Sequence, residues 1–122
     1  MAVNPLTGPF TLQLSTPAQD DITQILAWTQ EAFGDVGRTR YENLITTALI
    51  DLRNDPDRVG VRQRDDIGAG ICTYHLASSR KRVTTARQVA KPRHFVLFRV
   101  SRNVIEVARL LHDGMDLSQH LA

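Results

Sequence analysis

The spacing of the apolar residues changes once along this chain of 122 residues, from a helical period in the first half to a strand period in the second. Two segments, 16–33 and 41–55, repeat apolar residues every three or four positions, as amphipathic helices do. The first stripe is Ile22, Ile25, Leu26 and Phe33, with Trp28 at its edge, and the second is Tyr41, Leu44, Ile45, Ala48, Leu49 and Leu52. The segment 34–37 joins the two helices, so we expect an antiparallel helical hairpin.

Local signals mark the ends of both helices. Thr16 is a candidate N-cap, Pro17 suits the first helical position, and Gln19 completes a capping box. Gly34 is a typical residue for ending the first helix in a turn. Pro56 prevents the second helix from continuing much further.

Strand-like patterns account for most of the remaining chain. The predicted strands are 10–14, 71–77, 94–100 and 104–111. A tight turn at 101–102 between the last two would place Phe98 opposite Ile105 and Val96 opposite Val107. These pairs would form one apolar face for the helices to cover.

The predicted fold class is therefore α+β: an N-terminal strand, then the helical hairpin, packed on a small antiparallel sheet that three C-terminal strands complete. The length allows one hydrophobic core and not two, so we expect a single domain over 1–122. Residues 1–9 carry no regular pattern and are expected to be flexible.

Charge is unevenly distributed although the net charge is only +2. Ten of the thirteen acids lie within residues 1–66, and none occurs between Asp66 and Glu106. The basic stretch, 78–94, holds Arg80, Lys81, Arg82, Arg87, Lys91 and Arg93. We expect a basic loop over 78–92 that faces a substrate RNA, a DNA-bound enzyme or an acidic partner protein, with a solvated loop of no such role as the simpler interpretation.

Several function classes find no support in the sequence. One cysteine, Cys72, cannot form an internal disulfide, and no apolar run approaches the ~18 residues that span a bilayer. With no basic leader at the N-terminus, these features favour the cytoplasm. The glycines at 68–70 lack the Lys and Ser/Thr of a phosphate-binding loop. We expect neither a cofactor nor a metal site, because the acids and histidines of the tail, 112–120, lack a recognised ligand spacing.

Four segments carry a family resemblance. They read LSTPAQDDITQILAWTQEAFG, RYENLITTAL, HFVLFRV and EVARLLHDGMDLSQHL. Together they resemble the ParE-like branch of the RelE/ParE superfamily of bacterial toxins, from Leu12 to Leu121. The resemblance implies the toxin of a type II toxin–antitoxin pair, which inhibits DNA gyrase and is neutralised by a ParD-like antitoxin. Its RelE relatives are ribosome-dependent mRNA endonucleases.

The residues favour the first activity over the second. Where RelE-like enzymes present lysines, the corresponding strand has Thr73 and His75; Phe95 and Asp113 stand where arginines are expected, and no tyrosine follows Tyr74. A carboxylate repels phosphate, so we expect no catalytic residue. The resemblance then implies a stoichiometric inhibitor instead of an enzyme.

Two alternatives stay open: a plain nucleic-acid-binding module that binds DNA alone, and an mRNA endonuclease that uses histidines. His75, His94, His112 and His120 titrate near neutrality and are able to supply acid–base chemistry. Nothing in the sequence brings them together, and a lone histidine is more often structural.

Three sets of residues are candidates for partner contact. The first is the set of six cations in the basic stretch. The second, for the antitoxin, is Trp28 as an aromatic anchor together with Tyr41, although the stripe position of Tyr41 is typical of the core. The third is the C-terminal family motif, His112, Asp113, Met115, Asp116 and His120, whose simpler role is to cap and fix the end of the last strand.

Overall fold

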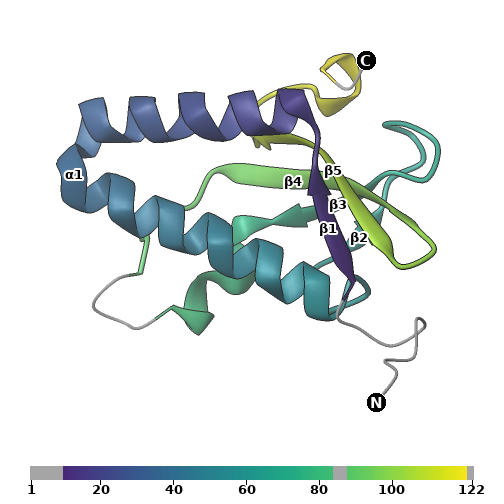
Figure 1. Cartoon of the computed structure of the whole chain (residues 1–122). Helices are drawn as coiled ribbons and strands as arrows, with labels where there is room; N and C mark the ends of the chain where they lie inside the picture. Colours follow the sequence, from purple (N-terminus) through teal and green to yellow (C-terminus); the bar gives the residue numbers. More distant parts are fainter. Residues whose placement is uncertain (1–9, 84–87, 121–122) are drawn as a thin grey trace.

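The structure, a computed structural model, describes residues 10–83 and 88–120. A long helix and a five-stranded sheet form two layers (Figure 1). The elements are β1 (Thr11–Leu14), α1 (Thr16–Asn54), β2 (Arg62–Gln63), β3 (Cys72–His75), the 3-10 helix η1 (Leu76–Arg82), β4 (His94–Ser101), β5 (Val104–His112) and the 3-10 helix η3 (Leu117–Gln119). The α+β class is confirmed, while residues 1–9, predicted to be flexible, lie outside the described part.

The sheet has the strand order β1-β5-β4-β3-β2. It is mixed, because β1 pairs with β5 in parallel and the other strands pair antiparallel. The expectation of a purely antiparallel sheet was wrong. A parallel pair needs a long crossover connection, which α1 and the strands after it supply here. Strand β2 was not predicted, because its two residues are too few to show a period.

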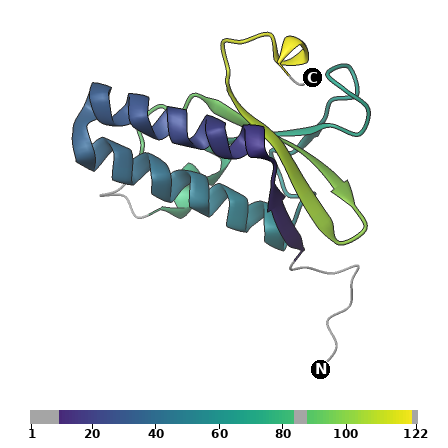
Figure 2. The ribbon, with the colours of Figure 1, turned by 45° about the horizontal axis from the view of Figure 1, so that its top comes forward.

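Helix α1 differs from the predicted pair of helices. It is one element, and only Gly34, at φ 77° and ψ −174°, leaves the helical conformation. Arg38 Nη1 donates to Gln30 Oε1 at 3.1 Å, so the chain reverses at this bend and its two arms, 16–33 and 35–54, lie side by side (Figures 1 and 2). The expected connecting segment 34–37 was wrong, because glycine accommodates the whole reversal at one residue and helical turns resume at Asp35.

The start of α1 is fixed to the sheet. Ser15, not Thr16 as predicted, is the N-cap: its Oγ accepts from Ala18 N at 3.0 Å and donates to Ala108 O at 2.7 Å. The second bond joins the helix terminus to β5. One hydroxyl therefore satisfies a free helix N–H group and sets where the helix layer begins on the sheet.

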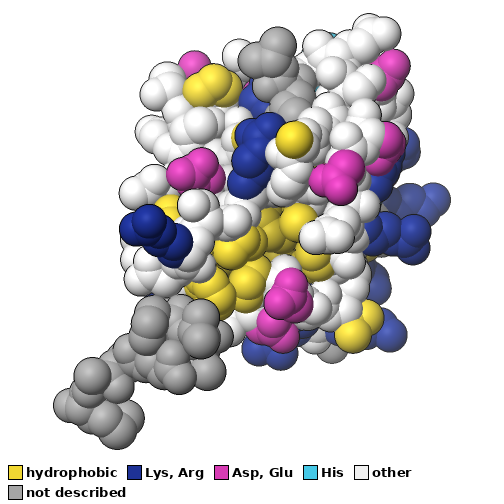
Figure 3. Space-filling view, turned by 90° about the vertical axis from the view of Figure 1, so that its right-hand side faces the viewer, with side chains coloured by type: hydrophobic (Ala, Val, Ile, Leu, Met, Phe, Trp, Pro, Cys, Tyr) yellow, Lys and Arg dark blue, Asp and Glu magenta, His cyan; other side chains and the backbone are white. Residues whose placement is uncertain are grey.

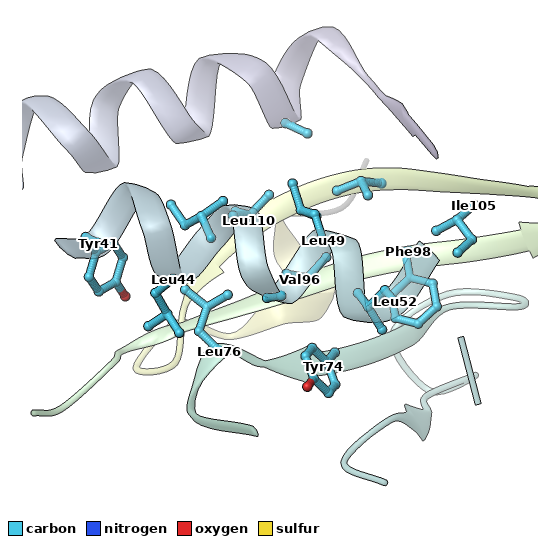
Figure 4. Close-up of a cluster of buried hydrophobic side chains, with 14 of the residues drawn as sticks. Tyr41, Leu44, Leu49, Leu52, Tyr74, Leu76, Val96, Phe98, Ile105 and Leu110 are labelled. Atoms are coloured by element: carbon cyan, nitrogen blue, oxygen red, sulfur yellow. The ribbon is translucent and has the colours of Figure 1, made fainter. Parts of the chain in front are cut away.

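The main core lies between α1 and the sheet. Figure 4 shows Leu44, Leu49 and Leu52 of the second arm directed toward the strands, where Val96, Phe98 and Ile105 meet them. The other sheet face carries a smaller cluster, Ile67, Ile71, Leu97, Leu111 and Leu117. Burial of each large side chain contributes about 1.5–3 kcal/mol, so the helix–sheet layer dominates stability. At the end of the molecule seen in Figure 3, hydrophobic side chains remain accessible in the middle of the face.

The β4–β5 pairing has a different register from the predicted one. Ser101 pairs with Val104, so the turn is Arg102 and Asn103, and Phe98 faces Val107 instead of Ile105. Arg102 adopts φ 56°, as tight two-residue hairpin turns require. An irregularity between Leu97 and Phe98 shifts the register once more, so that Val96 faces Leu110. The predicted register was wrong because the turn lies one residue further along the chain.

Candidate functional site: an apolar groove with an imidazole end

A groove of about 890 Å³ opens between the bend of α1, the segment before β4 and the segment after β5. Its apolar wall includes Ile25, Trp28, Phe33, Val36, Val89 and Met115, and its polar side includes Arg40, Tyr41, Lys91, Arg93, His94 and His112. The described lining contains no acidic side chain. The groove therefore combines a hydrophobic surface with a cationic margin.

Exposed aromatic side chains form one wall of the groove. Trp28 is 60% exposed and Phe33 is 67% exposed, and their rings pack edge to face with centroids 5.9 Å apart. The sequence placed Phe33 on the buried stripe, which was wrong, because the bend at Gly34 carries it away from the sheet. For Trp28 the sequence left core and surface open, and it lies on the surface. Large exposed aromatic side chains on a groove wall are typical of interaction sites.

Tyr41 is buried, as its stripe position predicts, and its hydroxyl reaches the groove floor. This hydroxyl lies 2.6 Å from His94 Nδ1 and accepts from Arg93 N at 3.1 Å. Burial raises the pKa of Tyr41 to about 12. Burial and, next, the neighbouring His112 lower the pKa of His94 to about 4, so His94 is neutral at pH 7.

Asp113, directly after β5, joins two side chains at this end of the groove. Arg93 Nε donates to Asp113 Oδ1 at 2.9 Å, and His75 Nε2 lies 3.0 Å from Asp113 Oδ2. The bond from Arg93, more than the one from His75, lowers the pKa of Asp113 to about 2. His75 Nδ1 accepts from Ala77 N at 3.0 Å, so both ring nitrogens of His75 are already engaged.

Three of the four histidines meet here, contrary to the expectation that nothing brings them together. The rings of His94 and His112 lie 5.5 Å apart, and His75 contacts Asp113, the residue after His112. His120 lies away from these three histidines, and its backbone carbonyl accepts a hydrogen bond from Arg109 Nη1. The turn at Arg102 and Asn103 alone would bring His94 opposite Leu111, and the irregularity between Leu97 and Phe98 shifts the register so that His94 pairs with His112. The predicted register would have paired His94 with Arg109 and so concealed the cluster.

The basic stretch is only partly a loop. Leu76–Arg82 form η1, and Arg82 Nε lies 2.8 Å from the buried Asp51 Oδ1. Arg80 Nε donates to Val89 O at 2.6 Å. Lys81 is exposed, Lys91 lines the groove, and Arg87 lies outside the described residues. Several of the six cations therefore have internal partners, and Lys81 and Lys91 have none among the described residues.

The C-terminal family motif fixes the segment after β5. Asp113 N donates to Arg93 O, and Gly114 N donates to His112 Nδ1 at 2.9 Å. Asp116 caps η3 through Ser118 N, which lets Leu117 join the smaller core cluster. Met115 stays 45% exposed at the groove.

Other chemistries find no support among the described residues. No group of three or more His, Cys, Asp or Glu side chains is arranged to hold a metal ion. Burial raises the pKa of Cys72, which disfavours the reactive thiolate. Within the described part of the chain, no helix is both long and apolar enough to cross a membrane.

Comparison with known proteins decides the family. A family model described as the ParE toxin of the type II toxin–antitoxin system parDE matches residues 12–117. The chain belongs to the ParE toxin family. A search of curated proteins found none that matches. As a ParE toxin of a parDE system, the chain has a ParD antitoxin as its partner.

Proposed function

We propose that this ParE toxin acts in the cytoplasm as a stoichiometric inhibitor of DNA gyrase, and that a ParD-like antitoxin neutralises it by covering the groove. The observation that carries the proposal is the family match over 12–117. The gyrase target follows from the resemblance to ParE-like toxins.

The chemistry of the groove end supports inhibition over catalysis. Asp113, at the position where nuclease relatives have an arginine, is ionised and held by Arg93 and His75. Thr73 is buried, and the ring of Phe95 packs against His75 with centroids 4.8 Å apart. A fixed carboxylate and two uncharged side chains are a poor setting for a pentacoordinate phosphate.

The groove suits the antitoxin. Trp28 supplies a large exposed apolar area, and Tyr41 supports the floor from below. An amphipathic partner segment would cover the apolar wall and bring its acids to Arg40 and Lys91 at the margin. The cations of the basic stretch that lack internal partners, such as Lys81, then remain for the antitoxin or for DNA held by gyrase.

The test uses purified toxin, bacterial DNA gyrase, ATP and supercoiled plasmid. Linear DNA should accumulate after detergent and protease treatment, and added antitoxin should suppress it. In the matched variant Trp28→Ala, antitoxin should protect less well while poisoning persists. Unchanged supercoiling with no linear DNA at stoichiometric toxin would reject gyrase as the target.

One observation favours a second candidate, a RelE-like ribosome-dependent mRNA endonuclease: the histidines converge. His94 and His112 would then supply the proton transfers through Nε2, the ring nitrogen that has no hydrogen-bond partner among the described residues, since both nitrogens of His75 are engaged. The test measures mRNA cleavage on translating ribosomes. Cleavage that is lost in His94→Ala with His112→Ala and kept in His120→Ala would support this activity; intact mRNA with wild-type toxin would reject it.

A further inference from the structure

The hydrogen bonds at the groove end assign the neutral forms of two imidazoles. Gly114 N–H donates to His112 Nδ1 at 2.9 Å, so the proton of neutral His112 is on Nε2. The Tyr41 hydroxyl already accepts from Arg93 N–H, so its own proton is used best by donating to His94 Nδ1 at 2.6 Å. The proton of His94 is then also on Nε2. Both rings therefore present an Nε2–H donor.

These two donors have no partner within the described residues. Both rings line the groove, and Arg58 Nε is the only buried side-chain nitrogen or oxygen without a hydrogen bond in that part of the chain. Both Nε2 atoms are therefore accessible to solvent, on rings that line the groove. Arg40 and Lys91 lie along the same lining; Arg93 lies there too, but its guanidinium is already paired with Asp113, which is beside the lining and not part of it. Two N–H donors beside cations, at the end of an apolar wall, are complementary to a carboxylate.

We propose that the imidazole end, His94 and His112, binds the carboxylate of one acidic side chain in an amphipathic segment of the ParD antitoxin. Apolar side chains of the same segment lie on Trp28, Phe33 and Met115. This inference rests on the proposed neutralisation through the groove. It adds which chemical group the partner contributes and which residues select it.

The same contact makes affinity depend on pH. The groups that face His94 are Tyr41 of α1, His75 at the end of β3, Arg93 before β4, and His112 and Asp113 at the end of β5. In the free toxin His94 has a pKa of about 4. A bound carboxylate favours its charged form and raises that pKa, so binding takes up a proton as the pH falls. The gain in antitoxin affinity is absent above the pKa that His94 has in the complex, and it grows as the pH falls toward 4.

The experiment measures antitoxin binding by calorimetry at about pH 7.5 and about pH 5.5, in two buffers of different ionisation enthalpy. The protein partner is the ParD antitoxin of the same parDE pair. Wild-type toxin should bind more tightly at the lower pH with net proton uptake. His94→Gln and His112→Gln should each lose about tenfold in affinity, and His94→Gln should also lose most of the pH dependence, while the control His120→Gln should change neither.

An antitoxin scan identifies the carboxylate. Each Asp and Glu is replaced in turn by Asn or Gln. One replacement should weaken binding to wild-type toxin about tenfold and have little further effect on His94→Gln. Additive losses at every acid would overturn the carboxylate contact.

A measurement on the unsubstituted toxin tests the proposal even if the histidine variants fail to fold. Nitrogen-15 spectra of the imidazoles should show the Nε2–H forms in the free protein, and a raised His94 pKa in the complex. Unchanged imidazole signals with normal antitoxin binding would overturn this inference alone, and failure of the antitoxin to bind would overturn the proposed neutralisation as well. His-dependent binding of RNA, with no effect on the antitoxin, would assign the imidazoles to a nucleic acid instead.

Discussion

Two aspartates hold arginines of the basic stretch, and they differ in depth. Asp51 lies inside the fold and contacts Arg58 at 3.2 Å and Arg82 at 2.8 Å. Asp113 lies at the groove and contacts Arg93 at 2.9 Å and His75 at 3.0 Å. The Asp51 side chain is 4% exposed and that of Asp113 is 23% exposed. An aspartate–arginine pair therefore has two roles in this molecule. Asp51 holds η1 against α1, and Asp113 holds Arg93 and His75 at the groove end.

The chain of bonds behind Asp51 explains its role. Ser79 Oγ donates to Asp51 Oδ2 at 2.7 Å, so the Tyr74 hydroxyl, 2.7 Å from the same Oγ, acts as the donor to Ser79. Tyr74 and Ser79 are fully buried. Removing the carboxylate would leave the buried Ser79 hydroxyl without its acceptor, and it would remove the counter-ion of the partly buried Arg58 and the exposed Arg82.

The largest effect is expected from Asp51→Ala. It should lower the free energy of unfolding by about 2–3 kcal/mol, because the buried Ser79 hydroxyl loses its acceptor and the partly buried Arg58 loses its counter-ion. Urea denaturation at pH 7 measures this, with the exposed Asp57→Ala as the matched control. A loss below about 1 kcal/mol would mean that solvent screens the cluster as it screens surface pairs.

Asp113→Asn should lower the free energy of unfolding less than Asp51→Ala does, by about 1–2 kcal/mol, since the Asp113 side chain is partly solvated. The folded pKa of about 2 lies below the ordinary 3.8, so the stabilisation is complete above pH 5 or so and is lost as the pH falls through 4 toward 2. Denaturation curves of wild type and variant should therefore converge at low pH. A difference that stays constant down to pH 2 would show that the charge is not responsible.

The two regions also differ in how far the sequence revealed them. The helical stripes predicted most of the core that surrounds Asp51, because periodicity reports burial directly. The groove end depends instead on strand register, and two features together moved His94 away from His112: a turn misplaced by one residue and the irregularity between Leu97 and Phe98, which no sequence pattern indicated. The exposed position of Phe33 depends on one glycine conformation, which a stripe does not encode. Contacts between distant residues such as His75 and Asp113 have no local signal at all.

Tyr41→Phe tests whether the groove floor is structural or specific. The variant loses the acceptor for Arg93 N–H and the partner of His94 Nδ1, which should cost about 1 kcal/mol of stability. Thermal unfolding measures the stability, and calorimetry measures antitoxin affinity. If Tyr41→Phe lowers the free energy of unfolding as much as Asp51→Ala does, the Tyr41 hydroxyl mainly stabilises the fold and is not specific to the groove.

Lys81→Glu should have the smallest effect on stability, within about 0.5 kcal/mol, because the side chain is exposed. Its neighbour Arg82 is held by Asp51, so Arg82→Glu should destabilise the fold clearly more. Denaturation of the two variants side by side therefore separates a cation with an internal partner from one that faces solvent. If Lys81 meets an anionic surface on the antitoxin or on gyrase-bound DNA, Lys81→Glu weakens that interaction at low salt, and the difference from wild type shrinks as salt rises. If wild type and Lys81→Glu bind equally well at low salt, Lys81 is not part of the contact surface, and the groove remains the site of recognition.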